Sequence, residues 1–300
     1  MKKNILEVIG NTPLIRLNHV TDKEIYVKLE KSNPGASVKD RPAYYMIKDA
    51  IESGKLKEGM KIVEPTSGNT GVALAYIGRA MGFDVTIVMP ESMSMERRAM
   101  IKSFGAELVL TPAAGGIKAS VDKAKELVAS GNYFMPDQFS NPANAKAHEE
   151  TTAKELLASN IDIRGFVAGI GTGGTVSGVG RVLKANDSSV QVWGLEPAES
   201  AIITTGQAGP HKIQGIGANF VPSLLDKSVV DKFITVTSDE AIEMARRLSQ
   251  EEGLMVGISS GANVAAAIKM ADEVAGPIVT VLPDTAERYL STPLFSIYEI

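Results

Sequence analysis

The amino-acid sequence predicts an α/β fold with two lobes, each with a mainly parallel twisted sheet flanked by helices. The first observation is that short apolar runs alternate with longer helix-like runs. The second is that glycine follows the helix-like runs and proline closes many of the apolar runs. Glycine tolerates the left-handed backbone that ends a helix, and proline cannot continue a strand ladder. This alternation is typical of a parallel sheet covered by helices on both faces.

The strand–helix units form two series. In the first, strands are predicted at 61–65, 84–90, 107–112 and 133–139, with helices over 69–81, through Phe104, and up to Gly131. In the second, strands are predicted at 165–171, 190–197 and 277–283, with helices over 174–186, 238–253 and 261–274. Residues 198–235 are irregular and rich in Gly and Pro, which in a compact protein is more typical of a functional loop than of a linker.

The length of the chain fits this division. A sequence of 300 residues exceeds one ordinary domain, so we expect two compact lobes with an active-site cleft between them. We place the smaller, N-terminal lobe at residues 35–145 and expect it to be mobile. The larger, C-terminal lobe is expected to combine residues 1–34 with residues 146–300.

Composition argues against several classes of partner. Net charge is −4 and the Lys and Arg residues form no dense block, so we expect no nucleic-acid binding. The first apolar run breaks at Glu7 and Gly10, and no run approaches membrane-spanning length, so we expect no signal segment and no membrane association. The chain has no cysteine, which excludes disulfides and thiolate chemistry, and its three histidines are scattered, so we expect no metal site. A cytoplasmic protein is predicted.

Lys39 lies in SNPGASVKDRP (32–42), between a Pro-Gly turn and Pro42. Proline is tolerated only in the first turn of a helix, so a helix is predicted to begin at Lys39 or Asp40. In one interpretation Ser37 caps this helix, Asp40 completes a capping box, and Lys39 is merely solvated. In the other, Lys39 is a catalytic amine, because the helix dipole disfavours a cation there and such an amine forms a Schiff base with an aldehyde cofactor.

The segment EPTSGNTG (64–71) concentrates polar residues in a turn between a predicted strand and a predicted helix. These residues are Thr66, Ser67, Asn69 and Thr70. A single Ser or Asn would suffice as an ordinary N-cap. Backbone N–H groups at a helix start, with hydroxyls beside them, bind anions, and ligands gather at the carboxyl ends of parallel strands. We therefore favour a carboxylate or phosphate site here.

The segment GIGTGGTVSG (169–178) also lies between a predicted strand and a predicted helix. Three of its glycines resemble a dinucleotide fingerprint, and Glu196 follows at a suitable spacing, so a nicotinamide-dependent oxidoreductase is a competing hypothesis. However, the third glycine comes two residues late, and Thr172 and Thr175 add hydroxyls that suit a terminal phosphate. A Gly-rich turn without a ligand is the remaining alternative.

The segment GISSGAN (257–263) is predicted to be a turn that enters a helix. Its two serines, Ser259 and Ser260, would each be ordinary caps if taken alone. Taken together, one lysine and several anion cradles at strand ends indicate a phosphorylated aldehyde and an amino-acid carboxylate. That combination is pyridoxal 5′-phosphate with its substrate.

Through these motifs and several others, the sequence resembles the fold-type II pyridoxal-phosphate enzymes, specifically the cysteine synthases (O-acetylserine sulfhydrylases). The resemblance covers essentially the whole chain. It is carried by IGNTPLIRL (9–17), NPGASVKDR (33–41), EPTSGNTGVALA (64–75), MPESMSMERR (89–98), GAELVLT (105–111), DQFSNPAN (137–144), GIGTGGTVSG (169–178), KIQGIGANFVP (212–222), GISSGA (257–262) and ERYLST (287–292). Several of these segments are long and specific.

The resemblance implies a role for each matching residue. Lys39 carries the cofactor as an internal aldimine, Asn69 bonds the ring oxygen, and Ser259 faces the pyridine nitrogen. The cofactor phosphate is held by the GTGGT loop, which comprises Gly171, Thr172, Gly173, Gly174 and Thr175. The substrate carboxylate is bound by Thr66, Ser67, Gly68, Asn69 and Thr70 together with Gln138, and Gly215 lies in the wall near the substrate.

The implied reaction is a β-replacement in which O-acetyl-L-serine and sulfide give L-cysteine and acetate. The substrate displaces Lys39, the freed amine removes the α-proton as acetate leaves to give an α-aminoacrylate, and sulfide adds to the β-carbon. A serine at the ring nitrogen makes the cofactor a weaker electron sink than an aspartate would, which suits β-elimination. The resemblance also implies a transferase of cysteine biosynthesis, a homodimer, and docking of serine acetyltransferase.

One departure from the family pattern lies in LPDTAERYLST (282–292), where cysteine synthases often carry two serines and a glycine. The pair Pro283–Asp284 looks more like cystathionine β-synthases. Asp284 is either near the cofactor ring, where it alters the choice of substrate or nucleophile, or an exposed turn aspartate. A cystathionine β-synthase, or a cysteine-desulfurating enzyme that releases sulfide or forms lanthionine, is the closest alternative. A paralogue that binds the cofactor without turnover is another.

Overall fold

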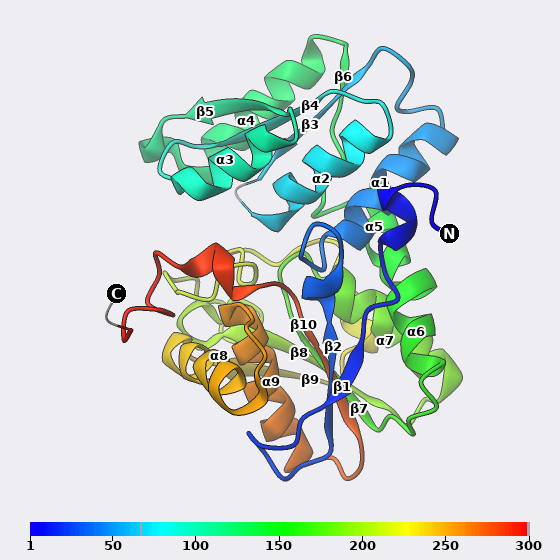
Figure 1. Cartoon of the computed structure of the whole chain (residues 1–300), viewed down its shortest axis with the longest axis vertical. Helices are drawn as coiled ribbons and strands as arrows, with labels where there is room; N and C mark the ends of the chain where they lie inside the picture. Colours follow the sequence, from blue (N-terminus) through cyan, green and yellow to red (C-terminus); the bar gives the residue numbers. More distant parts are fainter. Residues whose placement is uncertain (67, 299–300) are drawn as a thin grey trace. The chain divides into compact units, whose positions relative to one another are not determined.

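The structure is a computed structural model that describes residues 1–66 and 68–298. The chain divides into two compact units (Figure 1). The first comprises Met1–Ile9 with Lys39–Asn144, and the second comprises Gly10–Val38 with Ala145–Ile300. Each contains a sheet flanked by helices, and the predicted α/β class with mainly parallel sheets is confirmed. The predicted lobe boundaries and the mobility of the smaller lobe stay predictions.

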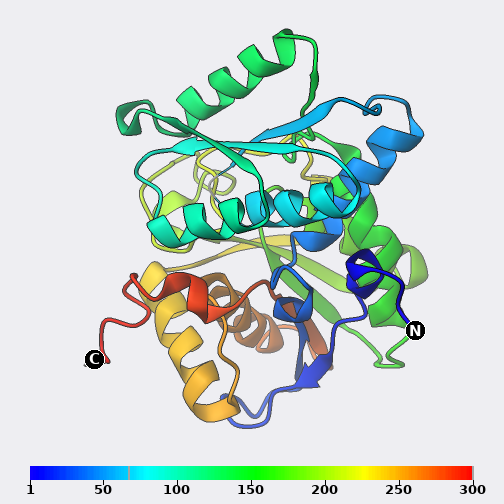
Figure 2. The same ribbon diagram turned by 45° about the horizontal axis from the view of Figure 1, so that its top comes forward.

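The first unit is built on a four-stranded parallel sheet in the order β5-β4-β3-β6. Its strands are β3 (Lys61–Pro65), β4 (Val85–Pro90), β5 (Glu107–Thr111) and β6 (Tyr133–Phe134). Its helices are α1 (Asp40–Glu52), α2 (Asn69–Ala80), α3 (Met95–Ser103) and α4 (Gly116–Ala129). Successive strand residues point to opposite faces, so Ile62 and Ile87 pack in the core with α1 and α2, whereas Val63 and Val88 pack against α4. Figure 2 shows α4 on one face of this sheet and α2 and α3 on the other.

The strand predicted at 133–139 is wrong beyond Phe134, because β6 has only two residues. Pro136 has no N–H to donate to a ladder, and Asp137 adopts a left-handed backbone with φ of 53°. The chain therefore leaves the sheet and turns. This turn places Gln138 away from any strand, which matters for the site described below.

The second unit is built on a six-stranded sheet in the order β1-β2-β10-β7-β8-β9, in which only β1 is antiparallel to its neighbour. Its strands are β1 (Leu14–Arg16), β2 (Ile25–Leu29), β7 (Gly165–Gly169), β8 (Gln191–Pro197), β9 (Lys232–Val236) and β10 (Ile278–Leu282). Its helices are α6 (Ala153–Leu157), α7 (Gly174–Asn186), α8 (Ser238–Glu252) and α9 (Ile258–Ala271), and α5 (Pro142–Ala147) runs from the first unit into a π-helix, η4 (His148–Thr152). Short 3₁₀ helices are η1 (Ile5–Val8), η2 (Glu30–Ser32), η3 (Ala113–Gly115), η5 (Ala198–Ser200), η6 (Lys227–Val229) and η7 (Ala286–Tyr289).

Two cores cover the two faces of this sheet. Val167 and Leu195 point to the face packed by α8 and α9. Phe166, the chain neighbour of Val167, and Val192, three residues before Leu195, point to the opposite face, which α6 and α7 cover. Figure 1 shows α8 and α9 on one side of the sheet and α6 and α7 on the other. Both faces are therefore buried, as the continuous apolar strands predict.

Some boundaries differ from the prediction. The helices predicted at 174–186 and 69–81 are confirmed to within one residue. The helix predicted at 261–274 begins earlier, at Ile258, so both serines of the GISSGA motif lie inside its first turn. The edge strand β9 lies, except for its last residue, in the segment 198–235 predicted to be irregular, because a five-residue edge strand that begins with a lysine gives little apolar signal.

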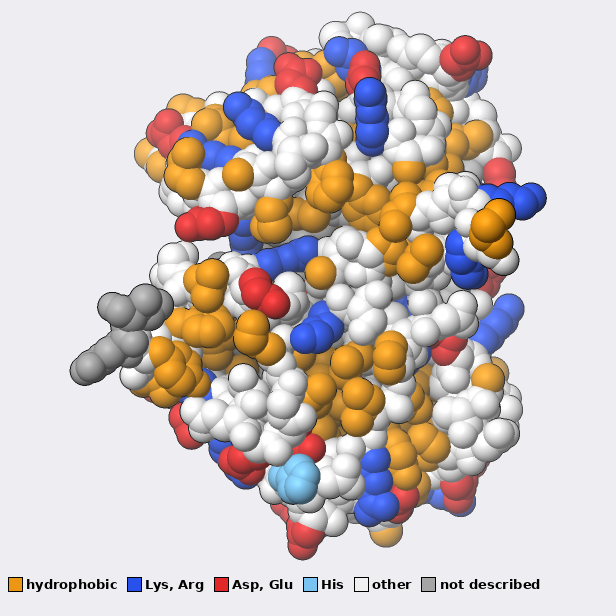
Figure 3. All heavy atoms as spheres, in the orientation of Figure 1, with side chains coloured by type: hydrophobic (Ala, Val, Ile, Leu, Met, Phe, Trp, Pro, Cys, Tyr) orange, Lys and Arg blue, Asp and Glu red, His pale blue; other side chains and the backbone are white. Residues whose placement is uncertain are grey.

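In the described part of the chain, no helix is both long enough and apolar enough to span a bilayer. On the face shown in Figure 3, acidic and basic side chains are interspersed, and hydrophobic side chains lie between them. This face therefore carries both positive and negative side chains.

Gly261 allows α9 to approach α8, and its replacement tests this packing. A Cβ at this position would lie 2.0 Å from the Ala241 carbonyl oxygen, which is backbone and cannot rotate away. We expect Gly261→Ala to lower the free energy of unfolding by about 1–3 kcal/mol, although alanine favours a helix over glycine. In the control Gly180→Ala, the nearest atoms are the ends of two valine side chains at 3.1 Å, and the loss is smaller. Urea unfolding measures both, and a Gly261→Ala variant as stable as the wild type contradicts this account.

Candidate active site

Lys39 is the N-cap residue of α1, so the predicted helix start is confirmed. Within the described residues no side chain caps this helix. The N-cap is therefore Lys39, not Ser37 as the capping interpretation expects. Ser37 forms an isolated β-bridge with Asp284, and Asp40 is buried with its Oδ2 accepting a 2.7 Å hydrogen bond from the Tyr76 hydroxyl. Burial, and then the Asp40 carboxylate, raises the pKa of the Tyr76 phenol well above its ordinary value, so Tyr76 remains the donor.

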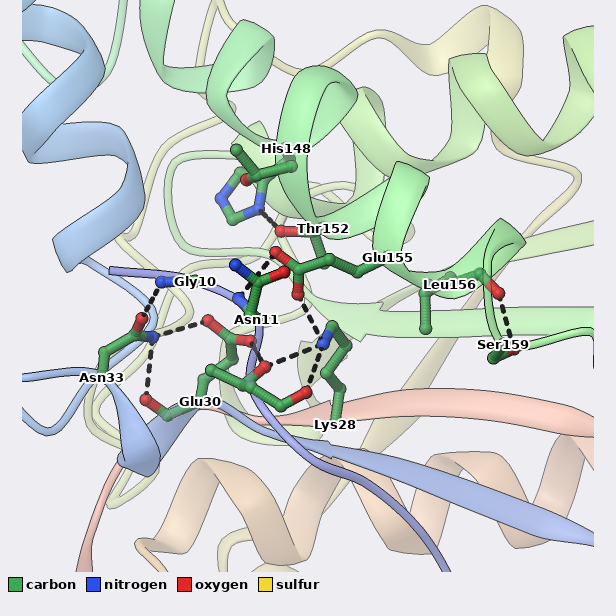
Figure 4. A network of polar contacts seen from close by, with 12 residues as sticks. Gly10, Asn11, Lys28, Glu30, Asn33, His148, Thr152, Glu155, Leu156 and Ser159 are labelled. Carbon is green, nitrogen blue, oxygen red and sulfur yellow. Dashed lines mark hydrogen bonds and ion pairs between the residues drawn. The ribbon is translucent and has the colours of Figure 1, made fainter. Parts of the chain in front are cut away.

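The segment that leads into Lys39 is fixed by Asn33, which is buried (Figure 4). Its amide nitrogen donates to the Glu30 carboxylate at 2.8 Å, to the Glu30 carbonyl at 3.0 Å and to the Ser37 carbonyl at 3.1 Å. Its amide oxygen accepts from the Gly10 N–H at 2.8 Å. Four hydrogen bonds from one side chain therefore tie the chain before Lys39 to residues of the second unit.

Asn33 is connected through Glu30 to a network of charged side chains that includes Lys28 (Figure 4). Lys28, 2% exposed, donates to Glu155 Oε2 at 2.6 Å and to both oxygens of Thr12 at 2.8 Å. The Thr12 hydroxyl donates in turn to Glu30 Oε1 at 2.7 Å, and Glu30 is fully buried. Buried charges are tolerated only when paired and hydrogen-bonded, so this network fixes one arrangement of the strand ends that carry it. Sequence reasoning missed it, although Lys28 and Glu30 inside an apolar strand end were a signal.

The TSGNTG residues lie at the start of the 12-residue helix α2, where the first N–H groups of a helix have no intrahelical partner. Gly68 is the N-cap, and its N–H donates to the Thr66 hydroxyl at 3.3 Å. A Cβ on Gly68 would have no described atom within 4 Å, so this side of the turn is open. Ser67 lies outside the described residues. The structure therefore presents N–H groups and a hydroxyl beside open space.

Gln138 lies in contact with this helix start. The Thr70 hydroxyl donates to the Gln138 amide oxygen at 2.6 Å, and both side chains are buried. The structure thus brings together two predicted carboxylate ligands that are 68 residues apart in the sequence. The main chain of Gln138 is held by Glu64, whose carboxylate accepts from the Gln138 and Asp137 N–H groups at 3.0 and 2.9 Å. Sequence reasoning missed Glu64.

The GTGGT loop precedes the 13-residue helix α7. Gly173 is its N-cap with φ of 85°, and the Thr172 hydroxyl accepts from the Gly174 N–H at 3.3 Å. A Cβ on Gly171 would lie 2.4 Å from the Gly215 carbonyl oxygen, so the structure brings the predicted phosphate loop and Gly215 together. Gly215 itself has φ of 95°, and a Cβ there would meet no described atom within 4 Å. The helix start and this open position suit a bound anion.

His148 is a second residue that sequence reasoning missed, because it was considered only as a metal ligand. It is buried in the π-helix, with Nδ1 2.9 Å from the Thr152 hydroxyl (Figure 4). Its Nε2 lies 3.3 Å from the Thr175 hydroxyl. Gly178 makes this approach possible, because a Cβ there would lie 2.3 Å from the Ala145 carbonyl oxygen and 2.8 Å from the His148 Cβ. His148 therefore orients a hydroxyl of the GTGGT loop.

Ser259 is buried in the first turn of α9. One turn later, Asn263 accepts from the Gly169 N–H and donates to the Val281 carbonyl, both at 2.8 Å. Asn263 thus links α9 to the ends of β7 and β10, and it was another residue missed from the sequence, although it lies four residues after Ser259 on the same face. The Ser260 hydroxyl is buried and has no hydrogen-bond partner within the described residues.

Asp284 is 1% exposed, so the alternative of an exposed turn aspartate is wrong. Its Oδ2 accepts from the Tyr289 hydroxyl. A Cβ added to Gly257 would lie 2.1 Å from Asp284 Oδ1, which is too close for any side chain, so only glycine fits at position 257. Gly257 is the N-cap of α9, and Asp284 therefore lies beside the helix start that carries Ser259.

Comparison with known proteins identifies the class. Residues 5–284 match the family model of the pyridoxal-phosphate dependent enzymes, and the chain belongs to that family. The oxidoreductase hypothesis is therefore wrong, and pyridoxal phosphate is confirmed as the cofactor of the family.

Within the family the similarity is to cysteine synthases. The chain is 50% identical to the cysteine synthase of Staphylococcus aureus, over 98% of this chain and 97% of that protein. The crystal structure of the cysteine synthase of Entamoeba histolytica matches with a TM-score of 0.96 and 41% identity, over 100% of this chain and 92% of that one. An O-ureido-L-serine synthase structure matches with a TM-score of 0.96 and 44% identity, over 100% of this chain and 97% of that one. The predicted family and enzyme class, a pyridoxal-phosphate dependent cysteine synthase, are confirmed.

The residues of this chain fit pyridoxal phosphate and an amino acid. In the first unit, the start of α2 and Gln138 offer donors next to the open position at Gly68. In the second unit, the start of α7 offers donors next to the open position at Gly215. The Ser260 hydroxyl keeps unused hydrogen-bonding capacity in the first turn of α9. Two anion-binding helix starts match the two kinds of anionic group, a phosphate and a carboxylate.

Replacement of Lys28 tests the ion network that is connected to Asn33. We expect Lys28→Met to lower the free energy of unfolding by about 3–5 kcal/mol, because it removes the buried ammonium group that pairs with Glu155 and donates to both Thr12 oxygens. The matched control is Lys118→Met, whose lysine is 82% exposed and pairs with Asp122 on the surface, with an expected loss below about 1 kcal/mol. Thermal and urea unfolding compare the two variants. Equal stability of the two variants contradicts the assigned role of Lys28.

Proposed function

We propose that this chain makes L-cysteine and acetate from O-acetyl-L-serine and sulfide, with the residues described above as its active site. The observation that carries this proposal is the contact between Thr70 and Gln138 at the start of α2, in the same unit as Lys39. It provides a site for an amino-acid carboxylate next to open space. The 50% identity to a cysteine synthase over nearly the whole chain supports it.

Lys39 is assigned the covalent and acid–base roles. When bound, pyridoxal phosphate supplies an aldehyde that links to amines and a ring that withdraws electrons from the substrate α-carbon. Lys39 Nζ anchors the cofactor, removes the proton from the substrate α-carbon as acetate leaves, and returns it after sulfide has joined the β-carbon. Its half-buried position at the uncapped start of α1 supports this assignment.

The anionic groups are assigned to the two helix starts. We assign the substrate carboxylate to the α2 start, where Thr66, Asn69 and the Gln138 amide nitrogen are donors, with Ser67 as a further predicted ligand. We assign the phosphate to the GTGGT loop, where the N–H groups of the α7 start and the hydroxyls of Thr172 and Thr175 are donors. The predicted hydroxyl role of Thr70 changes, because its proton is used on Gln138, so its N–H is the group left to bind the carboxylate.

Ser259 is assigned to the ring nitrogen. A serine hydroxyl does not enforce protonation there, as an aspartate would, which favours elimination over chemistry that needs a long-lived carbanion. The buried Asp284 lies at the same helix start, where its carboxylate accepts from the Tyr289 hydroxyl and its main-chain carbonyl accepts from the Gly257 N–H. Asn69 is assigned to the ring oxygen. No observation on the described residues favours the cystathionine β-synthase or sulfide-releasing alternatives.

Assembly and location are also proposals. We infer a homodimer, docking of serine acetyltransferase, and a cytoplasmic enzyme from the resemblance and from the cysteine-free sequence. Sedimentation with and without serine acetyltransferase tests the first two.

Lys39 gives the direct test of the proposed function. We expect Lys39→Ala to lower the rate of cysteine formation by at least about 10²–10⁴-fold, the contribution of a positioned base. Borohydride reduction of the cofactor-loaded wild type, followed by peptide mapping, is expected to label Lys39. The control is Lys48→Ala, on the same helix with a side chain 46% exposed, which keeps the wild-type rate. Label on another residue, or an active Lys39→Ala enzyme, contradicts the assignment.

A further inference from the structure

We propose that Glu64 is a positioning residue for substrate recognition, whose carboxylate holds the main chain of residues 137–138 so that Gln138 and Thr70 present their donors to the substrate carboxylate. The inference rests on the proposed function, which assigns Gln138 and the α2 start to that carboxylate. Glu64 itself touches neither substrate nor cofactor in this account.

The Glu64 carboxylate accepts main-chain hydrogen bonds from the segment after β6, where the pairing of β3 with β6 has ended. Strands β3 and β6 pair in parallel only through Lys61↔Tyr133 and Ile62↔Phe134. Beyond that point, the Asp137 and Gln138 N–H groups bond to Glu64 Oε2 and Oε1, at 2.9 and 3.0 Å. One carboxylate thus accepts from two consecutive N–H groups and fixes the turn after β6 to the end of β3.

Other contacts complete the turn around Gln138. The Asn144 amide donates to the Gln138 carbonyl at 2.8 Å, and Asp137 keeps its left-handed φ of 53°. The Thr70 hydroxyl donates to the Gln138 amide oxygen, which leaves the NH₂ group directed away from Thr70. In the described part of the chain, that nitrogen takes part in no other hydrogen bond. The end of Gln138 that remains is therefore a donor, as an anion requires.

The two hydrogen bonds from the Asp137 and Gln138 N–H groups to the Glu64 carboxylate, called the clamp from here on, depend on the ionised form of Glu64. A carboxylate accepts at both oxygens, whereas a protonated carboxyl places a hydrogen on one of them, opposite an N–H that is also a donor. Burial raises the pKa of Glu64 to about 7, although its two backbone hydrogen bonds act in the other direction. Among the described residues, Asp137 is the charged group that adds to this rise. The clamp is expected to be complete above neutral pH and to loosen as the pH falls.

Replacement of Glu64 by glutamine tests the inference, because it is expected to change KM much more than kcat. Glu64→Gln keeps the volume but turns one acceptor into a donor, so one main-chain bond is lost. We expect the KM for O-acetylserine to rise about tenfold, the loss of one hydrogen bond to a charged group, with kcat changed less than about twofold. The cofactor absorption spectrum is expected to stay that of the wild type. An unchanged KM, or a loss confined to kcat, overturns the proposal.

The matched control is Glu107→Gln on the neighbouring strand β5. Glu107 is exposed, and among the described residues its carboxylate accepts only the Thr86 hydroxyl, at 3.1 Å, so both kinetic constants are expected to stay at wild-type values. In the cofactor-free chain, hydrogen exchange of the Asp137 and Gln138 amides gives a readout without activity. We expect exchange about tenfold faster in Glu64→Gln than in Glu107→Gln. Equal exchange in the two variants contradicts the clamp.

A measurement on the wild-type holoenzyme decides the matter if Glu64→Gln does not fold. The dissociation constants of L-alanine and L-alaninamide are measured from changes in the cofactor spectrum. Both ligands react through an α-amine that is protonated below about pH 7, but only L-alanine has a carboxylate. Between pH 7 and about pH 5.5, we expect the affinity for L-alanine to fall about fivefold more than that for L-alaninamide, because Glu64 becomes protonated. The same pH dependence for both ligands overturns the proposal.

Failure of the inference can be told from failure of the proposed function. If borohydride labels Lys39 and cysteine is formed, but Glu64→Gln keeps the wild-type KM and amide exchange, then only the role of Glu64 is wrong. If Lys39 is not labelled, the proposed function itself is wrong.

Discussion

In the proposed function, the active site depends on two helix starts that directly follow parallel strands. In each unit a central strand ends, a short glycine-containing turn follows, and a helix begins with N–H groups that have no partner within the helix. These groups, together with the helix dipole, favour negative charge. We propose that the start of α2 binds the carboxylate of the amino acid and that the start of α7 binds the phosphate of pyridoxal phosphate. Lys39, the N-cap residue of α1, is proposed to supply the reactive amine.

The helix starts need support, and buried polar side chains supply it. Glu64 fixes the turn that carries Gln138, His148 orients Thr175, and Asn263 joins α9 to two strand ends. His148 and Asn263 each bond to groups from two segments of the chain, and Glu64 bonds to two consecutive N–H groups of a distant segment. In a dry interior an unpaired polar group is costly, so such a side chain stabilises one arrangement of its partners and penalises others. The active site is therefore fixed by residues that do not themselves contact a ligand in our account.

Much of the fold could be predicted from the sequence, because its signals are local. Glycine and proline mark the ends of helices and strands, and the helix at 174–186 was predicted to the residue. The prediction failed where tertiary structure overrides local pattern. The strand at 133–139 stops after two residues, before Pro136 and the left-handed Asp137, and Glu64, far away in the sequence, accepts the N–H groups of Asp137 and Gln138. The edge strand β9 was missed because its pattern is short and partly charged.

The site was less predictable than the fold. Motifs and a family resemblance supplied the candidate residues, but neither gives contacts such as that between Thr70 and Gln138. The supporting residues were missed because their signals are weak: a glutamate that ends an apolar strand, or a lone histidine, has many possible meanings. Asp284 shows the converse, because turn chemistry favours aspartate on the surface and only the structure reveals its burial against Gly257.

The central claim is that the α7 start binds the cofactor phosphate as a dianion held by main-chain N–H groups. Phosphorus NMR of the cofactor-loaded enzyme tests it most directly, because a free phosphate monoester titrates near pH 6. The account predicts one phosphorus shift, constant from about pH 5.5 to pH 8, because the helix start stabilises the dianion over this range. A shift that moves with pH as that of the free cofactor does would contradict it.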